Sequence, residues 1–336
     1  IYSFTFILFF QNNLYSNSTL ENVDDFGIIS LMYHRFEENK YPSTNIKIND
    51  FKNHLEIIKD NKIKFVNPKK FEEELTNNKK QRKVLLTIDD GFSSFYNNAW
   101  PYLKENRIPF ILFISTEAVG KYGYMTWDQI KEIEKEEFAF LGNHSHSHEY
   151  LVSYSFDDFK NDIDKSIKIF KDKVGYNPIF FSYPFGEYSL EQKVYISKRF
   201  KFAFGQHSGV IDLNKDQYEL PRFPINEQYG DINRFTRLVK YLPLQYNFIL
   251  PKDKLVNSLN NPPKMSINFF DEQKNLAKIS CYSNEGDSWN KTNIKLINNK
   301  LNIFFKDKFK ERRGRINCSL KDAEGWRWLG IQFSIN

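Results

Sequence analysis

Between Ile28 and about Pro224, short apolar runs alternate with segments of helical periodicity, and this alternation restricts the fold more than any other feature of the sequence. Apolar runs separated by amphipathic segments are typical of a parallel sheet covered by helices. The strands are expected at Ile28–Tyr33, Lys64–Val66, Val84–Ile88, Phe110–Ile114, Phe138–Gly142, Ile179–Tyr183 and Phe202–Gly205. Ser155 followed by Asp158 is a helix-start signal within this region. The sequence therefore predicts an α/β fold with enough strand–helix repeats to close a barrel.

Beyond about Pro251 the helical periodicity stops, and we place a domain boundary near residue 255. Short alternating segments separated by Asn, Gly and Asp then predict a small antiparallel sandwich. These segments are Met265–Phe270, Ala277–Ser283, Asn293–Phe305, Gly314–Leu320 and Trp328–Ile335. We expect a barrel over residues 27–254 and a small all-β, sandwich-like domain over residues 262–336. The pair Trp326 and Trp328 fits either the core of that domain or a carbohydrate-binding surface.

The two ends of the chain carry signals of an exported protein. Ile1–Phe10 has the length of the apolar region of a signal peptide, with a buried strand as the alternative. We expect a partial signal peptide over residues 1–16, a linker over 17–26, and a periplasmic, extracellular or envelope-associated protein. Cys281 and Cys318 lie in alternating segments and are either a disulfide, which suits that compartment, or two buried thiols.

Composition excludes several classes of protein. The 33 Phe, 19 Tyr and 5 Trp supply ample core material, so the chain is not generally disordered. No apolar run reaches about 18 residues, so no stable membrane span is expected. The net charge of +6 is small for 336 residues, and Lys and Arg do not cluster on a nucleic-acid-binding module. We therefore expect no nucleic-acid partner.

Histidines and acidic residues gather just past the ends of the predicted strands, where a parallel barrel places its functional groups. His34, the Asp89-Asp90-Gly91 turn, the His144/His146/His148 cluster and His207 all occupy such positions. His54 lies on a predicted helix instead, and we interpret it as structural.

Asp89, Asp90, His144 and His148 indicate a metal site. Adjacent carboxylates at the end of a buried strand repel each other, and a nearby cation would offset this repulsion. Alternatively, Asp89 or Asp90 caps the helix that follows. His144 and His148 are four residues apart, so one helical turn would place both imidazoles on one face. Two imidazoles and one carboxylate are a common set for Zn²⁺ or another divalent transition metal. In this geometry His146 points elsewhere.

These segments resemble the motifs of polysaccharide deacetylases, the NodB-homology family also called carbohydrate esterase family 4. Thr87-Ile-Asp-Asp-Gly91 is similar to the first motif, Gly142–His148 to the second, and Phe181-Ser-Tyr-Pro-Phe-Gly186 to the third. The resemblance covers roughly Ile28 to Pro251. It implies a distorted (β/α)₇ barrel and a metal-dependent hydrolase that releases acetate from an N-acetylglucosamine-containing polysaccharide or oligosaccharide.

The resemblance also implies roles for individual residues. Asp89 would be the general base, and Asp90, His144 and His148 would bind the metal, usually Zn²⁺, with Co²⁺, Ni²⁺ or Mn²⁺ as alternatives. The residues of the third motif would line the substrate groove, and a backbone N–H there would help hold the oxyanion; they are Tyr183, Pro184, Phe185 and Gly186.

The sequence departs from the family pattern at two places. The Arg that often opens the third motif is absent, so what orients Asp89 stays open. No Leu-x-His motif follows the barrel. His34, in Ser30-Leu-Met-Tyr-His34, instead resembles the arrangement in the permuted poly-N-acetylglucosamine deacetylases and is our preferred general acid; His207 competes for that role. Arg222 is expected to bind substrate or an acidic partner, or to form a structural ion pair.

Three other functions compete with N-deacetylation of a glycan. A carbohydrate O-acetyl esterase would use the same metal site, and sequence cannot separate the two activities. A non-catalytic glycan-binding protein would not need a base beside a metal. A serine hydrolase is disfavoured because the sequence has no Gly-x-Ser-x-Gly turn.

Overall fold

The computed structural model describes residues 26–336 except 78–79, 272, 287 and 311. The expected signal peptide and almost all of the expected linker lie outside the described residues. Within them, no helix combines the length and apolarity that crossing a membrane requires.

A curled sheet forms the first part of the molecule, with strand order β10-β1-β5-β6-β7-β8-β9. All these strands except β10 run parallel to their neighbours. Their bounds are β1 (Ile28–Tyr33), β5 (Lys83–Ile88), β6 (Phe110–Ile114), β7 (Ala139–Asn143), β8 (Phe180–Ser182), β9 (Phe202–Phe204) and β10 (Val210–Ile211), with β4 (Lys64–Phe65) beside β5. The predicted strands are confirmed to within one or two residues at their ends.

One short segment lies between the two ends of this sheet. Leu220 forms a parallel bridge to Phe204 of β9, and β11 (Phe223–Pro224) pairs in parallel with β1. The sheet is thereby curled into the distorted barrel that the sequence predicted. Arg222 lies within this closing segment, between the two bridges.

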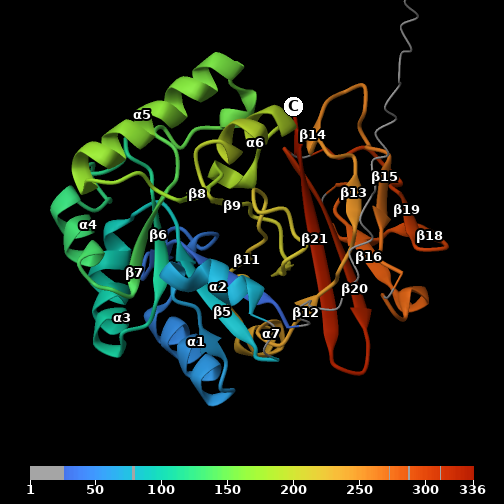
Figure 1. Ribbon diagram of the computed structural model, residues 1–336, viewed down its shortest axis with the longest axis horizontal. Helices are drawn as coiled ribbons and strands as arrows, with labels where there is room; N and C mark the ends of the chain where they lie inside the picture. The colour runs from blue at the N-terminus through green and yellow to red at the C-terminus, as the bar shows by residue number, and fades with distance from the viewer. Residues whose placement is uncertain (1–25, 78–79, 272, 287, 311) are drawn as a thin grey trace, which may run out of the picture.

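Helices cover the outside of the barrel (Figure 1). They are α1 (Ile48–Asp60), α2 (Phe71–Thr76), α3 (Trp100–Asn106), α4 (Trp127–Glu134), α5 (Phe156–Val174), α6 (Leu190–Ser197) and α7 (Ile232–Leu238). The predicted N-cap of α5 is confirmed, because the Ser155 side chain accepts a hydrogen bond from the backbone N–H of Asp158. Gly175 ends the same helix with φ 89°, a left-handed conformation that favours glycine. The apolar faces of α1, α3 and α4 pack on the strands in one core.

The last part of the chain forms two further sheets, with strand orders β12-β21-β20-β16-β17 and β13-β15-β19-β18 (Figure 1). Their strands are β12 (Leu242–Pro243), β13 (Phe248–Leu250), β14 (Leu255–Val256), β15 (Met265–Asn268), β16 (Ser280–Ser283), β17 (Asn290–Lys291), β18 (Asn293–Ile297), β19 (Lys300–Phe304), β20 (Arg313–Lys321) and β21 (Trp326–Ile335). A separate apolar core lies between these sheets. The domain boundary near residue 255 stays a prediction, although β12 and β13 precede it and pair with strands of these sheets.

The sheet that contains β20 and β21 packs closely on the barrel. The indole N–H of Trp328 donates to the Ser208 hydroxyl at 2.8 Å, and the Trp328 ring stacks on Tyr241. A Cβ added at Gly330 would lie 2.3 Å from the Ser208 carbonyl oxygen, so only glycine permits this approach. Trp328 therefore belongs to the contact with the barrel, whereas Trp326 is exposed.

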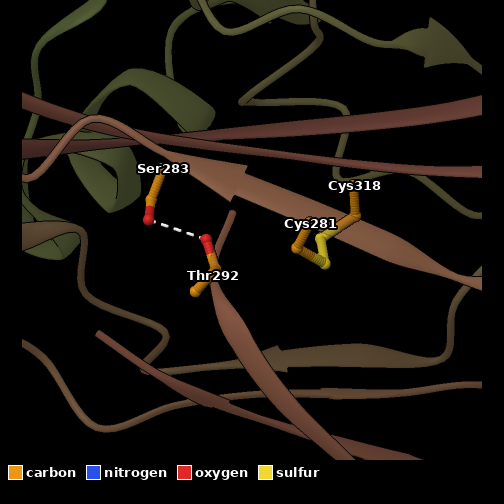
Figure 2. The surroundings of a disulfide bond; sticks show 4 residues. All are labelled: Cys281, Ser283, Thr292 and Cys318. Atoms are coloured by element: carbon orange, nitrogen blue, oxygen red, sulfur yellow. Dashed lines mark hydrogen bonds between the residues drawn. A yellow bond between two sulfur atoms is a disulfide. The ribbon is translucent and has the colours of Figure 1, made fainter. Parts of the chain in front are cut away.

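Cys281 and Cys318 lie opposite each other on β16 and β20 and form a disulfide (Figure 2). The bond closes a loop with a sequence separation of 37 residues. Replacing both cysteines by Ser is expected to lower the free energy of unfolding by about 2–4 kcal/mol, because the open loop gains entropy in the unfolded chain. Urea unfolding of the oxidised protein and the variant checks this, and equal midpoints would contradict it.

Candidate metal centre

The barrel brings three segments together at the carboxyl ends of its strands. Asp89 and Asp90 directly follow β5, and His144 directly follows β7. His34 follows β1, which pairs with β5 in parallel. Asp89 is held at this position by a hydrogen bond from its backbone N–H to the carbonyl oxygen of Tyr33.

Asp90, His144 and His148 converge on one point. One ligand atom from each residue lies within 4.8 Å of the other two. His144 Nε2 is 3.3 Å and His148 Nε2 is 3.0 Å from Asp90 Oδ1. His144 Nδ1 is 2.7 Å from the Ser182 carbonyl oxygen, so Nδ1 carries the proton and Nε2 offers a lone pair to the cluster. One carboxylate and two imidazoles thus face a common centre.

This donor set fits a divalent metal ion. Asp90 Oδ1 and His144 Nε2 are both buried atoms without a hydrogen-bond partner among the described residues. Buried polar atoms are normally satisfied, so two such atoms facing each other indicate a ligand between them. Burial opposes the charged form of Asp90, but His148 and His144 outweigh it and hold the pKa of this carboxyl well below its ordinary value. Burial also lowers the pKa of His148, and Asp90 reverses the effect and raises it above its ordinary value.

The two imidazoles do not converge through a helical turn, so that sequence prediction was wrong. The segment after β7 is an irregular loop in which Ser145 has φ 68° and His148 has φ 55°. The loop is fixed by side chains that accept its N–H groups. Asn143 accepts from Ser145, and the Asp162 carboxylate on α5 accepts from the backbone of His146 and Ser147. Strained left-handed residues persist where the surroundings hold them in this way.

His146 lies in the same loop but faces away from the cluster. Its Nδ1 is 2.9 Å from the Thr116 hydroxyl. His54 is buried on α1, where its ring lies within hydrogen-bond distance of the Tyr33 hydroxyl and the Gly230 carbonyl oxygen and stacks on Phe235. Neither histidine contributes to the group that could hold the metal.

Asp89 is completely buried and is held by Arg222. The guanidinium donates from Nη1 to Asp89 Oδ1 at 2.6 Å and from Nη2 to Oδ2 at 2.8 Å. Arg222 also donates to the Ser182 hydroxyl and, through Nε, to the Gly205 carbonyl oxygen. Burial opposes ionisation of Asp89, but Arg222, His144 and His34 outweigh it, so the pKa of Asp89 lies below its ordinary value. Asp89 is therefore an ionised carboxylate with a fixed orientation.

The bidentate contact with Arg222 orients Asp89, although the third motif has no Arg. Ser182, at the position nearest to that missing Arg, receives the hydrogen bond from Arg222. The guanidinium comes from the closing segment near β11, which is far from Asp89 in sequence, so sequence spacing gave no sign of the pair. Because Arg222 is 0% exposed, it lies beneath the site rather than on its surface.

Replacing Arg222 by Leu leaves a buried carboxylate unpaired and is expected to destabilise the protein by about 3–5 kcal/mol. Arg199→Leu is the matched control, because the Arg199–Asp164 pair is partly exposed, with side-chain exposures of 27% and 54%. That control is expected to lose about 1 kcal/mol or less. The midpoints of denaturant unfolding measure the loss of stability in both variants. Similar losses in the two would contradict the claim that Arg222→Leu leaves a buried, unpaired charge at Asp89.

The two candidates for the general acid occupy different places. His34 Nε2 lies 3.9 Å from Asp89 Oδ2, with 13% of its side chain exposed. Burial lowers the pKa of His34 more than Asp90 and Asp89 raise it. His207 lines a separate pocket with Tyr188, Glu219 and Lys254. Burial lowers the pKa of His207 to about 4, so this imidazole is neutral near pH 7.

The third motif follows β8 and forms a short turn beside the metal cluster. The Tyr183 side chain is buried against Phe181 and Tyr188 rather than facing the cluster. The backbone N–H of Tyr183 donates to Phe204, and that of Gly186 donates back to Tyr183, so neither is free for a substrate oxygen. Phe185 has φ 59°, and its ring centroid is 4.9 Å from that of His148. Phe185 therefore borders the cluster through its ring, and Ser182 borders it through its carbonyl oxygen.

Comparison with known proteins agrees with this arrangement. The sequence model of the family described as polysaccharide deacetylase matches residues 76–204, a range that includes Asp89, Asp90, His144 and His148 but neither His34 nor Arg222. A poly-beta-1,6-N-acetyl-D-glucosamine N-deacetylase of Staphylococcus aureus is 26% identical over 208 residues, which cover 56% of this chain and 69% of the relative.

Two solved structures share the fold. The Streptococcus pyogenes deacetylase PplD, in complex with acetate, superposes with a TM-score of 0.55 and 24% identity over 60% of this chain and 94% of that chain. IcaB from Ammonifex degensii superposes with a TM-score of 0.54 and 22% identity over 63% of this chain and 97% of that chain.

The fold and the site together define an α/β-barrel protein with an Asp-His-His cluster suited to a divalent metal and a buried, oriented carboxylate beside it. Residues 76–204, which contain Asp89, Asp90, His144 and His148, match the polysaccharide deacetylase family.

Proposed function

We propose that this protein is a metal-dependent hydrolase that removes N-acetyl groups from an N-acetylglucosamine-containing polysaccharide or oligosaccharide. The observation that carries the proposal is the position of Asp89, an ionised carboxylate with no role in the Asp90-His144-His148 cluster but directly beside it. A binding site alone would not need a second buried carboxylate held by its own arginine. The relative from Staphylococcus aureus, named as an N-deacetylase, supports an amide rather than an ester as the bond that is cleaved.

Asp90, His144 and His148 would hold the metal, for which Zn²⁺ is the best candidate because imidazole and carboxylate suit it. A metal bound there supplies Lewis-acid polarisation of the acetyl carbonyl and lowers the pKa of water. Co²⁺, Ni²⁺ or Mn²⁺ could serve in the same ligand set.

The proton transfers belong to residues of the chain. Asp89 would accept the proton of the attacking water, since Arg222 keeps its carboxylate ionised and fixes its orientation. His34, whose Nε2 lies 3.9 Å from Asp89 Oδ2, would donate a proton to the nitrogen of the leaving glucosamine. Asp90 and Asp89 favour the protonated form of His34, against the burial that lowers its pKa. The products would be acetate and a free amine.

His34→Gln is expected to lower kcat on an N-acetylglucosamine oligomer by about 10²-fold or more, whereas His207→Gln keeps nearly full activity. An acid matters less when the leaving group needs no proton, so an aryl acetate should be cleaved with a much smaller loss by the His34 variant. Initial rates on both substrates measure this. A loss in His207→Gln, or an equal loss of His34→Gln on both substrates, would contradict the assignment.

The choice between amide and ester substrates is tested with a panel of acetylated glycans. We expect acetate release from N-acetylglucosamine oligomers in β-1,6 or β-1,4 linkage, and much slower release from acetylxylan. Release from acetylxylan alone would reassign the same site to an O-acetyl esterase. Binding of the oligomers without any release would favour a non-catalytic glycan-binding protein.

We also propose that the protein is exported and works at or beyond the cell envelope. The Cys281–Cys318 disulfide supports this, because structural disulfides persist mainly in oxidising compartments. An N-acetylated glycan of the envelope or matrix would be the substrate partner. Detection of the mature protein outside the cytoplasm, with residues 1–16 removed, is the corresponding test.

A further inference from the structure

The third-motif turn is held by side chains from the C-terminal sheet. Gln332 of β21 is 5% exposed, and its Nε2 donates to the carbonyl oxygens of Phe185 at 3.1 Å and Gly186 at 3.0 Å. The other end of the same amide accepts from Arg315 Nε on β20 at 3.0 Å. Arg315 therefore fixes which way the Gln332 amide points, because only its NH₂ group can donate to the two carbonyls.

A second contact reaches the residue that follows this turn. Glu187 has a side-chain exposure of 1%, and Arg312, just before β20, donates from Nε to its two oxygens at 3.1 and 3.0 Å. Arg313 Nε lies 3.6 Å from the same carboxylate. A buried carboxylate with these partners is a fixed anchor, because separating the charges would leave Glu187 unpaired in the interior.

Arg312 also ends a row of stacked side chains that leads to the metal cluster. Its guanidinium carbon lies 3.3 Å from the ring centroid of Tyr150. Tyr150 stacks on Phe185 with centroids 4.2 Å apart, and Phe185 lies 4.9 Å from His148. Arg312 and Phe185 cannot share one face of the Tyr150 ring at these distances, so Tyr150 lies between them. The row thus connects the C-terminal sheet with a residue of the metal cluster.

We propose that β20 and β21 are part of the catalytic unit, with Gln332 and Arg312 as positioning residues that hold the Pro184–Glu187 segment against His148 as a wall of the substrate groove. This inference rests on the proposed deacetylase function and extends it. It assigns the C-terminal sheet a role at the reaction site, rather than that of a separate glycan-binding module. The close packing of Gly330 on Ser208 supports it, because that contact leaves the sheet no room to shift on the barrel.

Gln332→Leu tests the proposal, because leucine fills similar space but has no N–H to donate to the carbonyl oxygens of Phe185 and Gly186. The matched control is Gln245→Leu, since Gln245 is also buried and its Nε2 has no hydrogen-bond partner among the described residues. We expect KM for an N-acetylglucosamine oligomer to rise about tenfold in Gln332→Leu, with kcat changed less than about threefold, because a loosened groove wall weakens ground-state and transition-state binding alike. The amount of bound zinc should stay unchanged.

Hydrogen exchange provides a readout that does not depend on activity. In Gln332→Leu the backbone N–H groups of residues 183 and 185–187 should exchange faster than in the wild type, and in Gln245→Leu they should not. Arg312→Met serves as a second variant if Gln332→Leu folds poorly, and it should shift KM in the same direction.

The outcomes separate the two claims. Acetate release by the wild type together with an unchanged KM in Gln332→Leu and Arg312→Met would overturn this inference and leave the proposed function intact. An inactive wild type would overturn the proposed function. The hydrogen-exchange rates in Gln332→Leu and Gln245→Leu would then be the only test of the positioning role. Equal exchange of residues 183 and 185–187 in Gln332→Leu and Gln245→Leu would overturn that role.

Discussion

Asp89→Asn is expected to lower kcat for acetate release by about 10²–10⁴-fold while the protein keeps its bound metal. The substitution keeps the size of the side chain but removes the base that would take the proton of the attacking water. Asp89 does not belong to the Asp90-His144-His148 cluster, so the ligand set stays complete. Acetate release at saturating substrate and metal content per chain are the two measurements.

Asp89→Asn also leaves Arg222 without its charged partner, so the variant is expected to be less stable. This loss of stability must be separated from the loss of activity that follows from removing the base. Asp212→Asn is a suitable control, since Asp212 is 1% exposed and pairs with Lys215 at 2.9 Å away from the cluster. Both variants should unfold at lower denaturant concentration, but only Asp89→Asn should lose activity in the folded protein. Near-normal turnover by folded Asp89→Asn would remove Asp89 from the role of general base.

His148→Ala is expected to lose both metal and activity, because it removes one of three converging ligand groups. The metal should dissociate during dialysis against buffer, and acetate release should fall by about 10³-fold or more, since the reaction depends on the charge that the metal supplies. Metal per chain, measured by elemental analysis, is the direct readout.

His146→Ala is the matched control for this prediction. It removes an imidazole from the same loop, but that imidazole faces Thr116 rather than Asp90. It should keep metal and most of the activity. If His146→Ala lost the metal, or if His148→Ala kept it, the ligand set would have to be redrawn.

The strands of the barrel could be predicted closely because most of them are short, mainly apolar runs that are buried. β1, β5 and β6 are buried at every position, and each coincides with a run of apolar residues in the sequence. The positions just past these strands then followed from the geometry of parallel sheets, which placed Asp89, Asp90 and His144 at one end of the barrel.

The conformation of the His144–His148 loop could not be predicted from residue spacing. Four-residue spacing suggested a helical turn, but the loop depends on left-handed φ at Ser145 and His148 and on the distant carboxylate of Asp162. Such tertiary hydrogen bonds leave no periodic pattern in the sequence. Arg222 was recognised as a candidate, yet its contact with Asp89 depends on how the closing segment crosses between β9 and β1.

Five C-terminal segments were recognised from their alternation, of which Asn293–Phe305 forms two strands, β18 and β19. The sequence did not show how this part of the chain relates to the site. Alternation shows which residues share a face of a sheet, and it contains no information on what that face packs against. Gln332 and Arg312 carry no motif that distinguishes them from other polar residues of a strand. Their contacts with the Phe185–Glu187 segment appear only when the two parts of the chain are placed together.

Acetate release by the zinc-loaded protein, with and without a chelator, tests the central claim most directly. The substrate would be a β-1,6-linked N-acetylglucosamine oligomer, with free amine measured alongside acetate. We predict equal amounts of acetate and new amine, loss of both after chelation, and recovery when Zn²⁺ is added back. Release that continues unchanged after the metal is removed, or no release from metal-loaded protein, would contradict the account.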